Sequence, residues 1–407
     1  MKKRDFLLEK LIEKEEKRQR ETINLIASEN YPSKKVREIL SSLLVSKYSE
    51  GRPQKRYYGG VENIDKIELL TEKRVREVFG LSSFWAVNVQ PYSGSVANFA
   101  ILRGLLKRGE KIMSLALDQG GHLSHGHDVN FSSQDFEICH YFLNPKTLTL
   151  DYKEIEKRAK KEKPRLIIVG YTSYPRKVNF KIFSKIAKEI KAYLLADISH
   201  IAGLVIGKVH PSPFPWADVV MTTTHKTLRG PRGAIIVCKE ELKEKIFKAV
   251  FPGLQGGPHN QTIAGICACL AEAKSRAFKI YALQIVKNAK TLAKELKKYG
   301  FQLVTNGTDN HLLLLDLRTK KISGKTAQEI LEKAGIIVNK NPIPYDPANF
   351  FNPSGLRLGT PAVTTRGMKE KEMQKIALWI KEVLEKPSLA FKVKREVKKL
   401  ALHFKID

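Results

Sequence analysis

Residues 217–238 read ADVVMTTTHKTLRGPRGAIIVC, and this stretch decides the class of fold. An apolar run leads into three threonines and then into His225 and Lys226, and a second apolar run follows a turn rich in Gly and Pro. Short continuous apolar runs bounded by turn residues are typical of buried strands. Lys226 is therefore expected at the end of a buried strand, in a loop with little conformational freedom.

Similar apolar runs recur through the middle of the chain, with amphipathic helical stretches between some of them. They include KIMSLAL (111–117), RLIIVGYT (165–172) and AYLLADIS (192–199). Near-continuous apolar strands that alternate with helices predict an α/β fold with a mostly parallel mixed sheet flanked by helices. In such sheets ligands bind beyond the carboxyl ends of the strands, which is where Lys226 is expected.

The pattern changes after about residue 270. A long helix is expected over 271–299, and a second helix near 325–334. Short strands are expected at HLLLLDL (311–317) and IIVN (336–339), and a loop rich in Pro and Asn at 341–354. This mixture is typical of a smaller α+β domain.

The sequence therefore predicts three parts. They are an N-terminal arm at 1–45, a large cofactor-binding domain at 46–275 and a small C-terminal domain at 276–407. A chain of 407 residues suits two domains, because single hydrophobic cores stop growing at roughly 250–300 residues.

The composition is that of a globular protein with a strongly basic surface. No stretch approaches the about 20 apolar residues that a transmembrane helix needs, and the charged N-terminus lacks the apolar core of a secretory signal. A cytoplasmic protein is therefore expected. The chain has 72 Lys and Arg against 42 Asp and Glu, a formal net charge of +30. Because these cations are spread along the chain without interleaved aromatic residues, nucleic-acid binding is not expected as its main function.

Cysteine usage excludes two further classes of protein. Four cysteines are too few for a disulfide scaffold. Cys267 and Cys269 lie in the apolar run TIAGICACLAEA and are expected to be buried helical thiols. No Cys/His spacing is typical of a zinc site, so no metal is expected.

Lys226 has the setting of a reactive amine. A lysine held at a strand end beside hydroxyl groups can be desolvated, and its amine becomes nucleophilic when its pKa falls. An imine with an aldehyde cofactor requires such an amine. The alternative is a surface lysine in a turn, and this segment alone does not separate the two.

Asp197 is expected at the same edge of the sheet, because it ends the apolar run of residues 192–197. A carboxylate there can keep the ring nitrogen of pyridoxal phosphate protonated, which makes the ring an electron sink. His200 follows three residues later and could support either Asp197 or the ring. The alternative for Asp197 is the N-cap of a helix.

A third segment suits an anion. Ser93, Gly94 and Ser95 lead directly into an amphipathic stretch at 96–106. The free N–H groups at the start of a helix form a ready site for phosphate. The same arrangement also caps many ordinary helices, so it supports a phosphate site only together with the other two segments.

Eight motifs occur together in an order that resembles serine hydroxymethyltransferases. They are INLIASENY (23–31), KYSEGRPQKRYYGG (47–60), NVQPYSGSVAN (88–98), GGHLSHG (120–126), THKTLRGPRG (224–233), FPGLQGGP (251–258), TDNHL (308–312) and SGLRLGTPA (354–362). The resemblance implies a fold-type I pyridoxal-phosphate transferase that moves the hydroxymethyl carbon of serine reversibly to tetrahydrofolate, giving glycine and methylenetetrahydrofolate. The forms YYGG, GGHLSHG and QGGP resemble the folate-using bacterial and eukaryotic branch of the family.

The resemblance also implies which residues hold the cofactor. Lys226 would carry pyridoxal phosphate as a Schiff base, Asp197 would pair with its ring nitrogen, and His122 would stack on the ring. Thr172 and His200 would lie beside the phenolic oxygen. The remaining cofactor positions are Ser93, Gly94 and Ser95 for the phosphate, with Tyr48, Gly256 and Gly257 reaching it from the partner subunit.

Substrate and acid–base residues follow from the same motifs. Arg357 would bind the serine carboxylate, because its planar fork can take a carboxylate with two hydrogen bonds. Ser28 would contact the substrate, His225 would position it, and Glu50 is expected to do acid–base work around the serine hydroxyl or the pterin. The other positions implied for catalysis, substrate or folate are Thr223, Tyr57, Tyr58, Leu117, Gly121, His122, Leu123, Asn341, Ala348, Asn349 and Phe350.

The family pattern also implies a homodimer with shared active sites, because Tyr48 and Glu50 cross the subunit interface in the family. The chain departs from the pattern at several positions without losing a residue assigned to catalysis. Residues 82–85 resemble a short insertion, and Arg176 adds a cation near the strand end that bears Thr172. The sequence leaves the effect of Arg176 open.

Two other functions remain compatible with the sequence. A threonine aldolase of the same fold would share the lysine and the aspartate but lack a folate pocket. Glu50, the pair Tyr57 and Tyr58, and the loop at 341–354 therefore argue against it. A basic RNA-binding protein that has kept the enzyme fold is suggested by the net charge alone.

Overall fold

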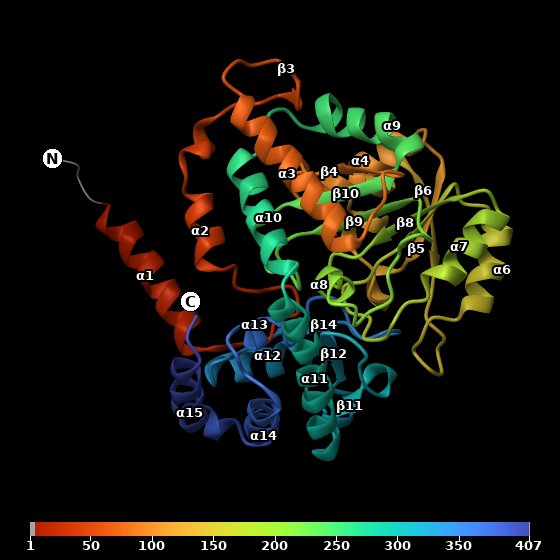
Figure 1. Ribbon diagram of the computed structural model, residues 1–407. Helices are drawn as coiled ribbons and strands as arrows, with labels where there is room; N and C mark the ends of the chain where they lie inside the picture. Colours follow the sequence, from red (N-terminus) through yellow and green to blue (C-terminus); the bar gives the residue numbers. More distant parts are fainter. Residues whose placement is uncertain (1–4, 407) are drawn as a thin grey trace.

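Two β-sheets organise the chain in the computed structural model, which describes residues 5–406 (Figure 1). The larger sheet has seven strands in the order β4-β10-β9-β8-β7-β5-β6. The pairs from β6 to β9 are parallel, and β10 runs antiparallel to both of its neighbours. The predicted α/β fold with a mostly parallel mixed sheet is therefore confirmed. The strands are β4 (Trp85–Asn88), β5 (Lys111–Leu115), β6 (Glu137–Tyr141), β7 (Leu166–Val169), β8 (Tyr193–Asp197), β9 (Val219–Thr223) and β10 (Ala234–Lys239).

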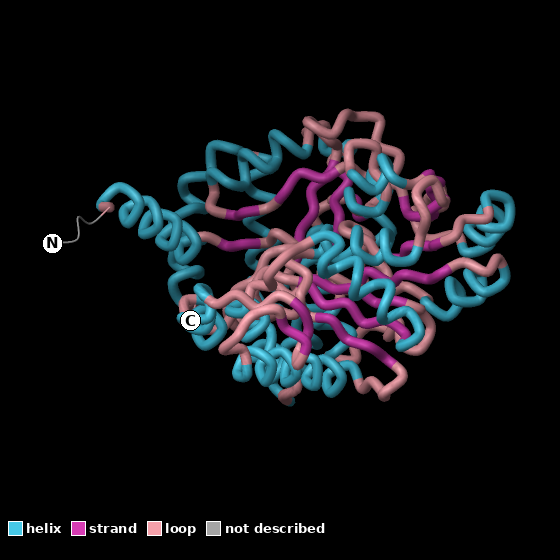
Figure 2. Tube along the Cα trace, turned by 90° about the horizontal axis from the view of Figure 1, so that it is seen from above, coloured by secondary structure: helices cyan, strands magenta, loops and turns pink. Residues whose placement is uncertain are grey.

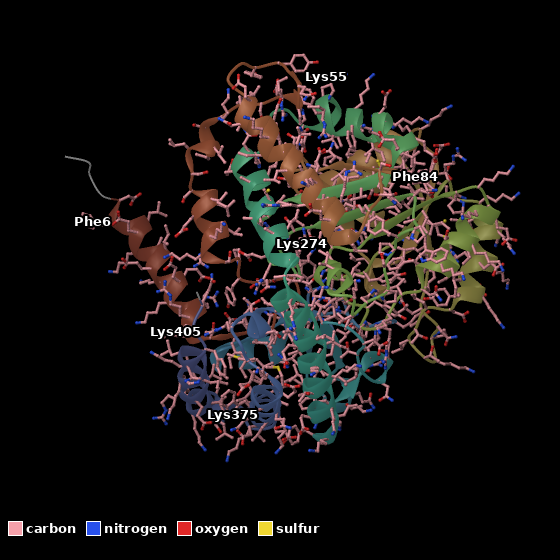
Figure 3. The ribbon with its side chains drawn as sticks, in the orientation of Figure 1. Phe6, Lys55, Phe84, Lys274, Lys375 and Lys405 are labelled. Atoms are coloured by element: carbon pink, nitrogen blue, oxygen red, sulfur yellow. The ribbon has the colours of Figure 1, made fainter. Side chains whose placement is uncertain are left out.

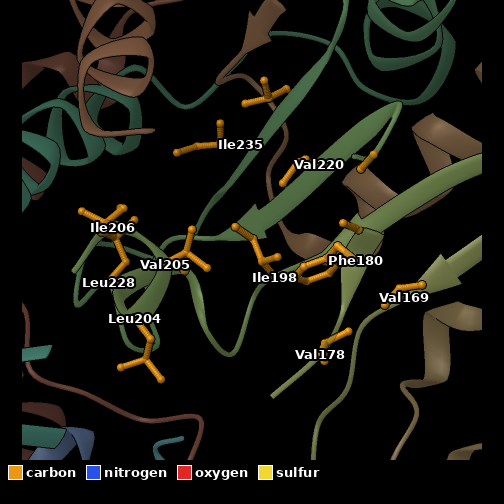
Figure 4. Packing of buried hydrophobic residues seen from close by; sticks show 14 of the residues in the cluster. Val169, Val178, Phe180, Ile198, Leu204, Val205, Ile206, Val220, Leu228 and Ile235 are labelled. Carbon is orange, nitrogen blue, oxygen red and sulfur yellow. The ribbon is translucent and has the colours of Figure 1, made fainter. Parts of the chain in front are cut away.

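Both faces of this sheet are buried, which explains why its strands are almost continuously apolar. Along β7, Leu166 and Ile168 pack into one hydrophobic cluster, whereas Ile167 and Val169 pack into another. Successive side chains of a strand point to opposite faces, so a strand covered on both sides needs apolar residues throughout. Figure 4 shows part of the cluster that contains Val169.

Helices cover the two faces of the large sheet. The face that bears Val169 is covered by α3 (Glu62–Phe79), α6 (Tyr152–Glu162), α7 (Phe180–Glu189), α8 (Ala202–Ile206) and α10 (Asn260–Ala273). The opposite face is covered by α4 (Gly94–Leu105) and α9 (Lys243–Lys248). A short helix, α2 (Lys34–Leu40), packs against α10. This arrangement leaves the carboxyl ends of β8 and β9 for a site, at Asp197 and Thr223.

The smaller sheet has four antiparallel strands in the order β11-β12-β15-β14. They are β11 (Gln302–Leu303), β12 (Leu312–Asp316), β14 (Asn339–Asn341) and β15 (Gly355–Gly359). Its helices are α11 (Arg276–Lys298), α12 (Gly324–Lys333), α13 (Pro361–Thr365), α14 (Glu370–Glu385) and α15 (Ala390–His403). The N-terminal β1 (Ile23–Asn24) pairs in parallel with β13 (Ile336–Ile337), and Ile23 is fully buried in the same cluster as this sheet. The boundaries at 45/46 and 275/276 stay a prediction.

The helix expected over 271–299 differs from the observed one at its start. α10 already ends at Ala273, and α11 begins at Arg276. Ser275 separates them, since its backbone is extended and its side chain accepts a hydrogen bond from the N–H of Phe278 at 3.1 Å. A serine in this position is a favoured N-cap, and the apolar periodicity on both sides concealed it. The expected insertion at 82–85 overlaps the start of β4, because Trp85 is its first residue.

The first helix, α1 (Phe6–Glu21), buries no residue and projects from the rest of the chain (Figure 2). Arg366 connects the C-terminal end of α1 to the end of α15. The guanidinium donates hydrogen bonds to the carbonyl oxygens of Thr22 and Phe404, both at 2.7 Å. These carbonyls follow the C-terminal ends of α1 and α15, where the helix dipole favours a cation.

The remaining composition-based predictions can be compared with residues 5–406. All four cysteines are buried and free, and Cys267 and Cys269 lie in α10 as expected. Within these residues, no helix is long and apolar enough to cross a membrane, and no group of three or more His, Cys, Asp or Glu side chains could hold a metal. Basic side chains such as Lys55, Lys274 and Lys375 lie on separate parts of the outside (Figure 3).

Candidate active site

A cavity of about 440 Å³ opens at the carboxyl ends of β8 and β9. It contains twelve of the residues that the sequence singled out for the cofactor, the substrate or catalysis. Its lining includes Ser28, Ser93, Gly94, Ser95, His122, Thr172, Asp197, His200, Thr223, His225, Lys226 and Arg357. A volume of this size is in the range of small-molecule sites. Segments from residue 28 to residue 357 therefore meet at the sheet edge that the strand pattern predicts.

Lys226 lies three residues beyond the end of β9, with its amine inside the cavity. Its Nζ donates a hydrogen bond to Oγ1 of Thr223 at 3.2 Å. Burial lowers the pKa of Lys226 from 10.5 to about 8, and the nearby Asp197 carboxylate opposes that shift. A substantial share of the amine is therefore neutral near physiological pH, as a nucleophile requires.

Asp197 ends β8 and faces Lys226 across the cavity as a buried carboxylate. Its Oδ2 accepts hydrogen bonds from Nε2 of His125 at 2.9 Å and from Nδ2 of Asn98 at 3.0 Å. Its Oδ1 accepts one from the N–H of Ser199 at 3.0 Å. Although burial opposes ionisation, these bonds hold the pKa of Asp197 well below its usual value. The site thus presents an ionised carboxylate where a protonated ring nitrogen could be bound.

The hydrogen-bond partners of Asp197 bear on one of the two alternatives left open for His200. His200 was expected to support either Asp197 or the ring, but the imidazole that contacts Asp197 is His125. His200 instead contacts His311, with 3.2 Å between Nδ1 and Nε2. His125 and Asn98 were missed by sequence reasoning. The second histidine of GGHLSHG was the available signal for His125, whereas Asn98 could be read only as one helix residue among others.

The start of α4 has the features that an anion site requires. Ser93 is the N-cap residue, and its hydroxyl makes no capping hydrogen bond. The backbone approaches closely at Gly94, where an added Cβ would lie 2.6 Å from Cγ2 of Thr223. Free N–H groups, two hydroxyls and a glycine that admits close approach suit a phosphate group.

Arg357 extends from β15 into the same cavity. Its Nε donates to Oδ1 of Asn339 at 3.1 Å, and Nη1 donates to the carbonyl of Thr172 at 2.8 Å. Burial lowers the pKa of Arg357 to about 10, and no carboxylate among residues 5–406 forms an ion pair with it. A buried guanidinium with an unused edge is a site for the carboxylate of a ligand.

Comparison with known proteins agrees with this geometry. Residues 1–380 match the family model of serine hydroxymethyltransferase. A serine hydroxymethyltransferase of Methanosarcina barkeri (strain Fusaro / DSM 804) is 54% identical over 383 residues, which are 94% of this chain and 92% of that protein.

The chain belongs to the serine hydroxymethyltransferase family. It is accordingly a fold-type I, pyridoxal-phosphate-dependent enzyme that transfers the hydroxymethyl carbon of serine to tetrahydrofolate. Residues of the cavity fit the cofactor, since an amine, an ionised carboxylate and an anion site converge there. Assignment to one branch of the family stays a prediction.

A second group of predicted residues in this serine hydroxymethyltransferase lies away from the cavity. None of Tyr48, Glu50, Tyr57, Tyr58, Gly256 and Gly257 contributes to its lining. They gather instead with one another. An added Cβ at Gly256 would lie 3.0 Å from Oε1 of Glu50, and the rings of Tyr48 and Tyr58 are 5.2 Å apart. A single chain therefore does not bring Glu50 to Lys226.

The positions implied for folate occupy two loops that lie side by side. The ring of Phe350 meets that of His127, four residues beyond Leu123, edge to face at 6.4 Å. Phe350 is 49% exposed, and Leu123 is 45% exposed. The members are Leu117, Gly121 and Leu123 in one loop, and Asn341, Ala348, Asn349 and Phe350 in or beside the other. Of the whole folate set, His122 alone among the described residues also lines the cavity.

Two of the cavity residues already have defined hydrogen-bond roles. Oγ1 of Thr172 donates its one hydrogen to the carbonyl of Gly121 at 2.7 Å, so toward the phenolic oxygen of the cofactor it can act only as an acceptor. Nδ1 of His122 accepts from the N–H of Ser124 at 3.1 Å, and burial lowers the pKa of His122 to about 4. His122 is therefore neutral, as a ring that stacks on an aromatic cofactor can be.

Proposed function

We propose that the cavity around Lys226 is where this enzyme binds pyridoxal phosphate and serine. One observation carries the proposal: three chemically distinct groups converge in a single cavity. They are an amine with a pKa of about 8 at Lys226, an ionised carboxylate at Asp197, and the Arg357 guanidinium, for which residues 5–406 supply no carboxylate. These groups suit an aldehyde, a ring nitrogen and an amino-acid carboxylate, respectively.

When bound, pyridoxal phosphate supplies an electron sink for the electron pair released as the Cα–Cβ bond of serine breaks. The neutral amine of Lys226 is the group that would hold the cofactor through its aldehyde, and it could exchange a proton with bound serine. Arg357 orients serine by its carboxylate, with Ser28 beside it. Thr223 holds the Lys226 amine in place through the 3.2 Å hydrogen bond.

The walls of the cavity hold the rest of the cofactor in this proposal. Ser93, Gly94 and Ser95 bind the phosphate with N–H groups and hydroxyls. Asp197 keeps the ring nitrogen protonated, and its own charge is maintained by the hydrogen bonds from His125 and Asn98. The further roles are stacking on the ring for His122, contact with the phenolic oxygen for Thr172 and His200, and substrate positioning for His225.

The acid–base group comes from a second copy of the chain in this proposal. Serine hydroxymethyltransferases are typically dimers, and Glu50 of the same chain does not line the cavity. We assign Glu50 of the partner subunit to acid–base work at the serine hydroxyl or the pterin. The accompanying residues from that subunit are Tyr48, Tyr57, Tyr58, Gly256 and Gly257.

Tetrahydrofolate is assigned to the two adjacent loops at the rim of the cavity. Their mutual contact between Phe350 and His127 and their partial exposure support a surface for a large, flat ligand. The folate-using branch, the cytoplasm as location and the division at 46–275 and 276–407 belong to the same proposal.

Serine cleavage with and without tetrahydrofolate tests the function. We expect formation of glycine from serine to accelerate strongly when tetrahydrofolate is added, and the purified protein to be yellow. Equal rates with and without tetrahydrofolate would favour an aldolase of the same fold. A colourless protein that stays colourless after addition of pyridoxal phosphate would contradict the cofactor assignment.

A further inference from the structure

A small closed cavity lies behind the wall of the active-site cavity. Its lining includes His200, His210 and His311. The volume that a water centre can reach in it is about 20 Å³, and a single water needs roughly 10–15 Å³. His200 also lines the large cavity around Lys226, whereas His311 borders only the small one. His200 therefore separates the two spaces together with Tyr171 and Asp197, which also line both.

His200 and His311 share one hydrogen between them. Nδ1 of His200 lies 3.2 Å from Nε2 of His311, and both rings are buried. Burial holds the pKa of His200 well below its usual value and lowers that of His311 to about 3, so both rings are neutral. A neutral imidazole carries a hydrogen on one nitrogen only. The contact therefore has one donor and one acceptor, and the choice fixes which nitrogen of His200 bears the hydrogen.

His210 provides a fixed end for this arrangement. Its Nδ1 lies 3.0 Å from the carbonyl oxygen of Pro211, which can only accept a hydrogen bond. Burial lowers the pKa of His210 to about 4, so the ring is neutral and its single hydrogen lies on Nδ1. Nε2 of His210 is then an acceptor. This atom and Nδ1 of His311 are both buried without a partner among the described residues, and both residues line the small cavity.

We propose that His210, one water and His311 form a relay that sets the tautomer of His200, so that Nε2 of His200 carries a hydrogen toward the active-site cavity. The water donates one hydrogen to Nε2 of His210 and the other to Nδ1 of His311. His311 then carries its hydrogen on Nε2 and donates it to Nδ1 of His200. His311 and His210 are positioning residues in this scheme, because they act through His200.

The opposite tautomers leave buried groups unsatisfied at both ends of the relay. If Nδ1 of His200 donated to His311, the water would have to accept from Nδ1 of His311. Only one hydrogen of the water would then have an imidazole acceptor, and the other would be a buried donor without one. This arrangement is disfavoured, because unpaired buried donors are rarer in proteins than unpaired buried acceptors. At the other end, a bare Nε2 of His200 would face the cofactor's phenolic oxygen, and two acceptors would meet. Both ends thus favour the same tautomer.

The inference rests on the proposed place of His200 beside the phenolic oxygen, so its test has two separate readouts. The first is nitrogen NMR of full-length protein carrying isotope-labelled histidine, with and without pyridoxal phosphate, which reports the protonated nitrogen of His200. The second is the equilibrium dissociation constant for pyridoxal phosphate. His200 signals are assigned by their loss in His200→Asn, and His140, which contacts Ser114 rather than the relay, is the internal reference.

Two substitutions at His311 should differ. His311→Leu removes the donor, so the hydrogen of His200 should no longer stay on Nε2, and pyridoxal phosphate should bind about tenfold more weakly. His311→Gln places an amide N–H near the lost Nε2–H and should restore both the tautomer and the affinity to within about threefold. His210→Phe, which keeps a ring but removes the acceptor, should disturb the tautomer of His200 from a distance.

Each outcome decides a part of the proposal. A wild-type His200 that carries its hydrogen on Nδ1 would overturn the relay, as would an unchanged His200 tautomer in both His311→Leu and His210→Phe. If the tautomer changes as expected but the affinity for pyridoxal phosphate does not, the relay is supported and the proposed contact of His200 with the phenolic oxygen fails. The conservative His311→Gln variant guards against a folding defect in His311→Leu.

Discussion

The two groups of predicted site residues differ in how complete they are within one chain. Around Lys226, side chains from distant segments converge in a cavity of about 440 Å³. Around Glu50, the neighbouring tyrosines face outward, with Tyr57 77% exposed and Tyr48 56% exposed. One chain thus gathers most residues proposed for the cofactor and the amino acid in one cavity, whereas Glu50, the proposed acid–base group, lies in a separate patch beside exposed tyrosines.

The difference shows which properties of the proposed site arise from burial within one chain and which require a second subunit. Burial is the main cause that lowers the pKa of Lys226 and the cause that lowers the pKa of Arg357, because desolvation disfavours their charged forms. The patch around Glu50 needs a second surface before it can exclude water from a reaction. A dimer that places Glu50 of one subunit at Lys226 of the other supplies that surface. Substitutions can test the separate contributions of the Lys226 cavity and the Glu50 patch. The largest loss of activity is expected at Lys226.

Lys226→Ala should destroy the cavity's chemistry while leaving the Glu50 patch unchanged. Without the amine we expect a colourless protein and a fall in kcat/KM of at least about 1,000-fold, the scale of a lost proton-transfer group. Absorbance and serine-to-glycine assays measure the two effects. Dimerisation and thermal unfolding should stay as in the cofactor-free wild type. A Lys226→Ala protein that kept wild-type turnover would move the active site elsewhere.

Glu50→Gln should lower the activity of the pure variant by about 100-fold or more. Mixing it with Lys226→Ala under conditions that exchange subunits should restore activity. Each mixed dimer then has one site with both an intact Lys226 and an intact Glu50. Random exchange makes half of the dimers mixed, so recovery should approach about a quarter of wild-type activity.

The matched control for that mixing experiment is the double variant combined with wild type. If the two residues act across the interface, every site of a mixed dimer lacks one of them, and only wild-type dimers contribute. Wild-type dimers are then a quarter of all dimers, so exchange should lower the activity of this mixture from about a half to about a quarter of wild-type activity. If the two residues act within one chain, exchange should leave this mixture at about a half and should restore nothing in the single-variant mixture. That pair of results would refute the shared site.

Sequence reasoning found the cavity where the signal was local. Lys226 and Asp197 follow or end apolar strands, so the fold class and the rule for ligand sites in parallel sheets were enough to place them together. His125, Asn98 and His311 were missed as functional neighbours because their importance depends on contacts across the fold. Asn98 is a residue within α4, and only its 3.0 Å bond to Asp197 shows what it does.

Arg176 was noticed in the sequence, but its interaction partners could not be predicted from it. In sequence it was a cation near the strand end that bears Thr172, with an open effect. In the structure its Nε donates to Oγ1 of Thr305 and its Nη1 pairs with Asp309, both at 3.0 Å. The charge is directed to the segment before β12 and not into the cavity. Only the path of the chain after residue 300 could have revealed this partner.

Arg357→Lys separates substrate binding from cofactor binding inside the cavity. A lysine keeps the charge but loses the planar fork, so we expect the KM for serine to rise by about ten- to a hundredfold, the range of a charge-assisted hydrogen bond. Affinity for pyridoxal phosphate should change little. Arg366→Lys is the matched control, since Arg366 binds carbonyl groups at the ends of α1 and α15. It should lower thermal stability and leave the KM unchanged.

The smallest expected effect concerns the titration of Lys226. With a pKa of about 8, the reaction of cofactor-free protein with pyridoxal phosphate should reach half its limiting rate near pH 8, because the neutral amine is the nucleophile. The Thr223 hydroxyl accepts a hydrogen bond from Nζ and stabilises the charged form most. Thr223→Val should therefore lower the pKa by less than about one unit and move the rate profile to lower pH.

The neighbouring Thr222 provides the control for this titration. Its hydroxyl donates to the carbonyl of Thr223 at 2.8 Å and does not contact Lys226, so Thr222→Val should leave the midpoint in place. A midpoint near pH 10.5 in the wild type would mean that the cavity does not desolvate the amine. The contrast between a cavity that buries Lys226 and a Glu50 patch with exposed tyrosines would then lose its physical basis, since burial would not lower the pKa of Lys226 within the single chain.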